Sequence, residues 1–119
     1  MEVTSASTLF EALSSPVRLE LFRLLVRFAP EGLVAGEIAK HLQLPGTNLS
    51  FHLKGLLHAG LITVEKEGRF LRYRANIPLM LETIAYLTEE CCAGHPEQCE
   101  RFRAQSTVSA AVLPERCCK

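Results

Sequence analysis

Apolar residues between positions 34 and 60 recur every three or four residues in two short runs, which is the spacing of amphipathic helices. Gln43-Leu44-Pro45-Gly46 separates the runs, because proline disfavours helix in the residue before it and glycine relaxes a turn. Gly60 follows the second run at a position typical of a helix C-terminus. The pattern predicts a helix-turn-helix. Its apolar positions are Ile38, Ala39, Leu42, Leu49, Leu53, Leu56 and Leu57.

Alternating apolar and polar residues, the pattern of strands, follow at residues 61–64 and 70–75 on either side of Glu67-Gly68. A hairpin over this stretch would have Arg69 near its tip. The chain is therefore predicted to be mainly α with a β-hairpin wing, a winged helix-turn-helix. In the second strand, one face would hold Leu71, Tyr73 and Ala75, and the other Phe70, Arg72 and Arg74.

Three further helices are predicted around this unit. Residues 8–14 form a short helix that Thr8 and Glu11 can close as a capping box. Residues 17–28 form a core-facing helix that starts at Ser15-Pro16 and keeps its arginines, Arg18 included, outside. Asn76 can cap a last major helix that runs to about Cys91. One stripe of that helix holds Met80, Ile84, Leu87 and Cys91.

The polar face of the second helix of the helix-turn-helix is suited to DNA, because such a helix can enter a major groove. Asn48 can pair two-fold with adenine, and an exposed Phe51 can contact a thymine methyl. Gly55 and His58 are also predicted to point outward. Any solvated amphipathic helix has a polar face, so a second observation is needed. The residues predicted to bind DNA from this helix are Thr47, Asn48, Ser50, Phe51, His52 and Lys54.

The charge distribution is that second observation. The 119-residue chain has a formal net charge of zero, but residues 47–75 carry five Lys/Arg and two Glu, a net +3. Residues 1–46 and 76–119 carry net charges of −1 and −2. We expect Lys54, Arg69 and Arg72 to meet phosphates, with double-stranded DNA as the partner.

The segment from Ser50 to Ala75 resembles the ArsR/SmtB family of winged-helix repressors. The likeness covers roughly residues 9–87, and Gly46 departs from it, because many members have a polar residue there. The resemblance implies a homodimer that pairs through its terminal helices. Residues 1–99 would form one domain with the inducer site at its C-terminal end, and residues 100–119 a partly mobile tail. The matching motifs are Ser50-x-His52-Leu53-Lys54-x-Leu56, Ala59-Gly60-Leu61, Gly68-Arg69 with Tyr73, and Ser15-Pro16-x-Arg18-Leu19.

Other function classes find little support in the sequence. No catalytic arrangement of Ser, His and Asp, of Cys and His, or of paired carboxylates stands out, and the chain contains no Asp, so an enzyme is not predicted. The N-terminus lacks the basic and apolar regions of a signal peptide, and no apolar run has transmembrane length. We therefore expect a cytoplasmic protein without membrane contact, whose cysteines are reduced.

All five cysteines lie beyond residue 90. Neighbouring residues point about 100° apart on a helix, but Gly94 and Pro96 would break the helix and let Cys99 approach Cys91 and Cys92. Three thiolates without a fourth ligand suit a soft ion with trigonal coordination, such as As(III) or Sb(III). Some arsenic-responsive members of the family look similar. The predicted function is a repressor that As(III) or Sb(III) releases from operator DNA.

Other chemistries for the same cluster stay open. Zinc would add His95 to the three cysteines as a Cys3His site, and cadmium or lead would use the thiolates alone. Oxidation to a disulfide or a sulfenic acid would make the cluster a redox switch. Cys117 and Cys118 are auxiliary ligands at most. A winged helix that contacts protein and holds structural zinc is the alternative from a different class.

Overall fold

The computed structural model describes residues 1–89, 93 and 95–108. The chain divides into two compact units, Glu2–Leu79 and Met80–Lys119, the latter with Met1. Among the described residues, no helix is both long enough and apolar enough to cross a membrane.

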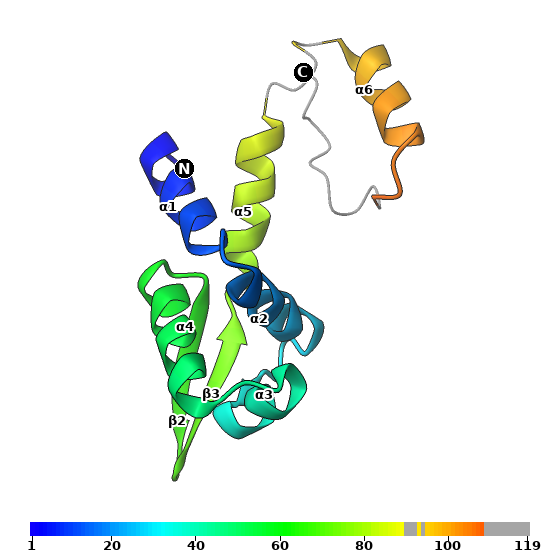
Figure 1. Cartoon of the computed structure of the whole chain (residues 1–119). Helices are drawn as coiled ribbons and strands as arrows, with labels where there is room; N and C mark the ends of the chain where they lie inside the picture. The colour runs from blue at the N-terminus through cyan, green and yellow to red at the C-terminus, as the bar shows by residue number, and fades with distance from the viewer. Residues whose placement is uncertain (90–92, 94, 109–119) are drawn as a thin grey trace. The chain divides into compact units, whose positions relative to one another are not determined.

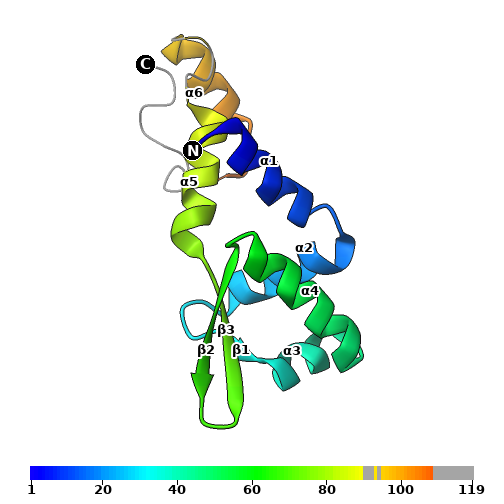
Figure 2. The ribbon, with the colours of Figure 1, turned by 90° about the vertical axis from the view of Figure 1, so that its left-hand side faces the viewer.

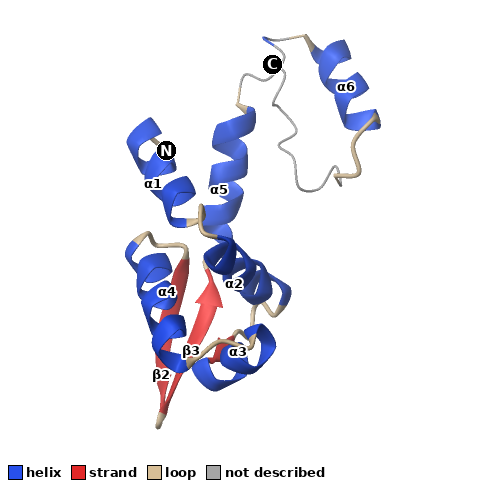
Figure 3. Ribbon diagram, viewed as in Figure 1, coloured by secondary structure: helices blue, strands red, loops and turns tan. Residues whose placement is uncertain are grey.

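The first unit has the winged helix-turn-helix order that the sequence predicts (Figures 1 and 3). Its last strand leads into a helix that continues into the second unit, which also contains a short C-terminal helix. The elements are α1 (Val3–Ala12), α2 (Pro16–Arg27), β1 (Leu33–Val34), α3 (Ala35–Leu42), α4 (Gly46–His58), β2 (Ile62–Glu67), β3 (Phe70–Ala75), α5 (Ile77–Thr88) and α6 (Pro96–Ala104).

The core of the first unit lies beneath the helix-turn-helix and fixes α4. Leu21 and Leu25 of α2, Ile38 of α3, Leu56 of α4 and Ile62 of β2 are its most deeply buried large side chains. Helix α2 contacts both α4 and β3, and α3 contacts α4. Full burial of such a side chain contributes about 1.5–3 kcal/mol. The polar face of α4 is therefore held in place by apolar packing on its opposite side.

The turn between α3 and α4 differs from the sequence-based expectation at its first residue and at its last. The left-handed residue is Gln43, with φ of 53°, which ends α3. Gly46 is instead the first helical residue of α4, so the expectation that it relaxes the turn is wrong. The other end of α4 is as predicted. Gly60 has φ of 80°, and the N–H groups of Gly60 and Leu61 donate to the carbonyls of Leu57 and Leu56, a Schellman arrangement.

The sheet contains a third strand that the sequence pattern did not reveal. Two-residue β1 pairs antiparallel with β3, which lies between β1 and β2 (Figure 2). Leu33 lies opposite Tyr73, and burial raises the pKa of the Tyr73 phenol. Gly32 precedes β1 with φ of 75°, and a Cβ there would overlap the Tyr73 carbonyl. Glycine is therefore required for this close approach.

Two predicted helix boundaries are corrected, and one helix is added. Helix α1 begins at Val3, so Thr8 lies inside it, and its hydroxyl donates to the Thr4 carbonyl instead of capping. Helix α5 ends at Thr88, and Cys91 lies outside the described residues. Helix α6 was not predicted, and it contains residues 100–104 of the expected tail. The predicted cap of α5 is confirmed, because Asn76 Oδ1 accepts from the Leu79 N–H at 3.3 Å.

Candidate nucleic-acid interface and thiol site

Helix α4 presents the predicted polar face to solvent. Leu49, Leu53 and Leu56 are buried on the other side, as the helical period requires. Phe51 is 65% exposed, which leaves it available for an apolar contact. His52 is half-buried at the flank. The exposed members of the predicted set are Thr47, Asn48, Ser50, Phe51 and Lys54.

Arg18 belongs to this face, which sequence reasoning missed. Although it comes from α2, its Nε donates to His52 Nδ1 at 3.3 Å, and its Cζ lies 5.3 Å from the centre of the Phe51 ring. Gly55, expected to point outward, lies against this guanidinium, and a Cβ there would be 2.6 Å from Arg18 Cζ. The only sequence signal for this contact was Gly55 itself, a glycine in the interior of a predicted helix, where no turn requires one.

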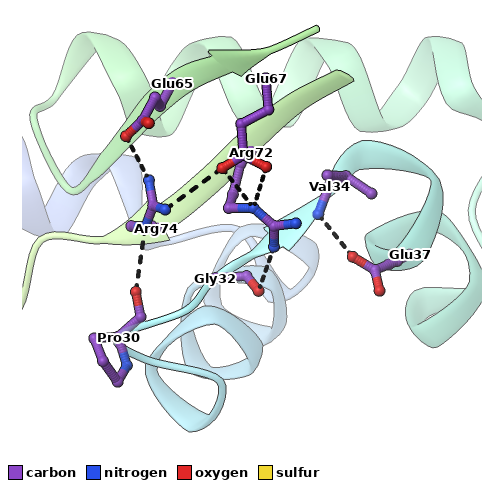
Figure 4. Close-up of polar contacts among 8 residues, drawn as sticks. All are labelled: Pro30, Gly32, Val34, Glu37, Glu65, Glu67, Arg72 and Arg74. Atoms are coloured by element: carbon purple, nitrogen blue, oxygen red, sulfur yellow. Dashed lines mark hydrogen bonds and ion pairs between the residues drawn. The ribbon is translucent and has the colours of Figure 1, made fainter. Parts of the chain in front are cut away.

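The wing arginines are held by ion pairs on one face of the hairpin (Figure 4). Arg72 Nε contacts both carboxylate oxygens of Glu67, at 2.9 and 3.0 Å, and its Nη1 donates to the Gly32 carbonyl at 3.2 Å. The hydrogen bond and the charge of Glu67 raise the pKa of Arg72. Arg74 pairs with Glu65 at 3.0 Å and donates to the Pro30 carbonyl at 3.2 Å. These contacts tie the wing to the loop before β1.

This pairing identifies the available positive charge. The two glutamates of residues 47–75 are matched by Arg72 and Arg74. Lys54, Lys66 and Arg69 account for the remaining net charge of +3, are exposed, and form no ion pair within the part of the chain that the structure describes. A phosphate contact by Arg72 would have to compete with Glu67. We therefore expect Arg69, in the hairpin turn, to be the main phosphate contact of the wing.

The thiol cluster lies mostly outside the described residues, which include neither Cys91 and Cys92 nor Cys117 and Cys118. Cys99 lies in α6, is 6% exposed and is disulfide-bonded.

His95 precedes α6, and its Nδ1 is 3.7 Å from a carboxylate oxygen of Glu97. Over residues 1–89, 93 and 95–108, no three His, Cys, Asp or Glu side chains gather as a metal site. The three-thiolate site stays a prediction.

The proteins whose sequences are similar to this chain are transcriptional regulators. A model of a helix-turn-helix domain matches residues 13–65. The arsenical resistance operon repressor of Staphylococcus xylosus is 34% identical over 76 residues, covering 64% of this chain and 70% of that protein. The HTH-type transcriptional regulator CmtR of Mycobacterium tuberculosis is 31% identical over 107 residues, covering 89% of this chain and 88% of that protein.

Solved structures with a similar fold include regulators of the same kind. An ArsR-like transcriptional regulator from Rhodococcus sp. RHA1 superposes with a TM-score of 0.60 at 25% identity, covering 86% of this chain and 82% of that one. The homodimeric winged helix-turn-helix domain Mb0332 of Mycobacterium bovis, at 18% identity, shares the fold with a TM-score of 0.60, covering 90% and 84%. Identity of this extent, together with the fold, shows that the chain belongs to the ArsR/SmtB family of DNA-binding transcriptional repressors, which is not a class of enzymes.

Proposed function

We propose that this chain represses transcription in the cytoplasm as a homodimer on operator DNA and is released when As(III) or Sb(III) binds Cys91, Cys92 and Cys99. The observation that carries the DNA contact is the exposed positive charge of Lys54 on α4 and of Arg69 in the wing, neither of which forms an ion pair with another described residue. Phosphate contacts give affinity and register, and the α4 side chains give sequence preference.

Each element of the interface has its own role in the proposal. Asn48, Ser50 and His52 read bases or fix α4 on the backbone, while Lys54 and Arg69 meet phosphates. Two copies of α4 related by a two-fold axis enter successive major grooves. The operator is therefore a palindrome with half-site centres about 10 base pairs apart.

Helix α5 supports the homodimer. None of its residues is fully buried, and Leu81 and Leu87 are 46% and 60% exposed. Exposed leucines on an apolar helix favour a partner surface, and a small chain gains much from burying them. The homodimeric Mb0332 domain supports the same assembly for this chain.

The donor set supports a soft, thiophilic inducer. Cysteine thiolates select soft ions, and three of them match the trivalent state of arsenic and antimony. Similarity to an arsenical resistance operon repressor supports As(III). Similarity to CmtR covers more of the chain and does not distinguish the inducer.

The inducer acts through a coupling free energy between its site and the DNA interface. Closing three thiolates on one ion changes the chain just beyond α5, which we assign to the dimer interface. A changed interface alters the relative pose of the two α4 helices, and these must match a fixed groove separation. Such couplings are typically about 1–3 kcal/mol, or about 5–150-fold in affinity. The linkage is reciprocal, so operator DNA weakens As(III) binding by the same factor.

The test is a DNA-release titration. An operator is first selected from a random duplex library, and its complex with the full chain is followed by fluorescence anisotropy in a thiol-free reductant, because Cys99 must be a free thiol. As(III) and Sb(III) should release the protein, whereas Zn(II), Cd(II) and Pb(II) should not, nor should peroxide added after the reductant has been removed. Release by one of those agents instead would assign the inducer to it. A protein that prefers no duplex sequence would refute the repressor itself.

Cysteine variants test the ligand set. Cys91→Ser, Cys92→Ser and Cys99→Ser should each abolish the As(III) response and leave operator binding unchanged. A Cys117→Ser, Cys118→Ser double variant is the matched control and should respond as the wild type does. Full response of Cys99→Ser would refute the three-thiolate site, and loss of response in His95→Ala would favour zinc.

A further inference from the structure

A contact between α2 and α4 joins Arg18 to two residues of the DNA-facing helix. Arg18 Nε donates to His52 Nδ1 at 3.3 Å, and its guanidinium lies 5.3 Å from the centre of the Phe51 ring. The rings of Phe51 and His52 meet edge to face, with centres 5.4 Å apart and planes at 70°. One guanidinium therefore lies beside both aromatic side chains, and its hydrogen bond is to His52.

The direction of the hydrogen bond fixes the chemistry of the histidine. A guanidinium can only donate, so His52 Nδ1 must carry a lone pair. A neutral imidazole that accepts at Nδ1 has its proton on Nε2. No hydrogen bond joins Nε2 to another side chain or carbonyl in the described part of the chain. The ring thus keeps one unused donor at the flank of α4.

We propose that Arg18 is a positioning residue that holds His52 as the Nε2–H tautomer, so that this N–H donates to an acceptor on operator DNA. The acceptor is a purine N7 in the major groove or a phosphate oxygen, and both are hydrogen-bond acceptors within reach of such a helix. This inference rests on the proposed DNA-binding function and names a contact within that interface.

Gly55 provides independent support, because it leaves the space that Arg18 occupies. A Cβ at residue 55 would lie 2.6 Å from Arg18 Cζ and 2.8 Å from each terminal nitrogen. Glycine is unfavourable inside a helix, so its place in the third turn of α4 has a packing reason. The clash would be with the end of a flexible side chain, so Gly55→Ala should move the guanidinium and leave α4 intact.

A direct phosphate contact by Arg18 is the competing explanation. Arg18, Lys54 and His58 line an open cavity of about 570 Å³ between α1, α2 and α4, and Glu11 lines it too. A phosphate-binding Arg18 would contribute to affinity independently of His52 and would steepen the salt dependence. A positioning Arg18 would act only through His52. The affinity losses of Arg18 and His52 variants would therefore add if Arg18 binds phosphate, and would not add if Arg18 positions His52.

The first experiment observes the tautomer directly in the free protein. Long-range proton–nitrogen NMR spectra of the full chain, labelled with ¹⁵N in its histidine rings, distinguish Nδ1–H from Nε2–H. The wild type at pH 8 should show His52 with its proton on Nε2 alone, and Arg18→Met should shift both nitrogens toward the values of a tautomer mixture. Arg23→Met, at an exposed position of the same helix, is the matched control and should leave the His52 signals unchanged. A wild-type His52 protonated on Nδ1 would overturn the inference.

The second experiment locates the acceptor. Selected-operator duplexes carry 7-deazapurines or methylphosphonates at single positions. At the position that His52 contacts, wild-type affinity should fall by about 2–12-fold if the acceptor is a purine N7, and by about 12–150-fold if it is a charged phosphate, the ranges for one hydrogen bond to a neutral and to a charged group. A 7-deaza effect identifies purine N7, and a methylphosphonate effect identifies phosphate. His52→Ala should lose affinity for the natural operator and become insensitive to that one modification.

The third experiment separates positioning from a structural role. Arg18→Met should lose the same sensitivity as His52→Ala, and the double variant should be no weaker than His52→Ala alone. Gly55→Ala should also lose it, while keeping or raising the Tm because alanine favours helix. Additive losses, or a Gly55→Ala variant with wild-type sensitivity, would overturn the inference while leaving operator binding established. A wild-type protein that prefers no duplex sequence would overturn the proposed function as well.

Discussion

The wing contains two arginines three residues apart whose electrostatic roles should be separable. Arg69 lies in the hairpin turn without an ion pair among the described residues, whereas Arg72 is bound to Glu67 and to the Gly32 carbonyl. Arg69→Ala removes a charge that can displace counterions from DNA. Arg72→Ala removes a charge that Glu67 already neutralises. The first change should therefore alter the salt dependence of binding, and the second should mainly weaken the attachment of the wing.

The expected magnitude follows from counterion release. Each phosphate neutralised on B-DNA contributes about −0.9 to the slope of log affinity against log salt. Two Arg69 residues in a homodimer would thus contribute about 1.8, and their loss should reduce the affinity change between 50 and 200 mM salt by about tenfold. Arg72→Ala should leave the slope near that of the wild type and lower the free energy of unfolding.

The assay is anisotropy on the selected operator at five salt concentrations, with thermal unfolding of each variant measured in parallel. Glu67→Gln is a third, informative variant, because it frees Arg72 and should steepen the slope. An Arg72→Ala slope as shallow as that of Arg69→Ala would refute the reasoning. That result would mean that Arg72 exchanges Glu67 for a phosphate when DNA binds.

Three further predictions concern single positions. Gly32→Ala should lower the free energy of unfolding by about 1–3 kcal/mol in chemical denaturation, because φ is positive there and the added Cβ meets the Tyr73 carbonyl. Gly36→Ala is the control: its Cβ would lie in open space within α3, so it should be neutral or stabilising by up to about 1 kcal/mol. Burial raises the pKa of Tyr73, so above about pH 10 the unfolded chain loses this proton before the folded chain does, and stability falls as pH rises. Tyr73→Phe should therefore flatten the dependence of Tm on pH between about 9 and 11, and an unchanged dependence would contradict this. Phe51→Ala should make binding insensitive to thymine-to-uracil exchange at one operator position, and retained sensitivity would remove Phe51 from the reading face.

The sequence by itself determined the elements whose signals are local. The apolar period predicts α2, α3 and α4, and alternation predicts β2 and β3, because each pattern depends on residues only a few positions apart. Local end signals were equally informative. Ser15 caps α2 by accepting from the Arg18 N–H, and Gly60 ends α4. The order of these elements, with the family motifs they contain, was enough to predict the winged helix-turn-helix and its DNA-binding class.

Tertiary structure alone decided which charged groups are available and which side chains meet. Arg18 and His52 are 34 residues apart, and Arg72 and Gly32 are 40 apart, so no local pattern could pair them. Two-residue β1 is too short to show alternation and exists because β3 offers it an edge. Helical periodicity predicts which face a residue occupies, but a charge on that face remains available for DNA only if folding brings no opposite charge or acceptor beside it. That is why Arg69 and Arg72, alike in the sequence, have different surroundings in the fold.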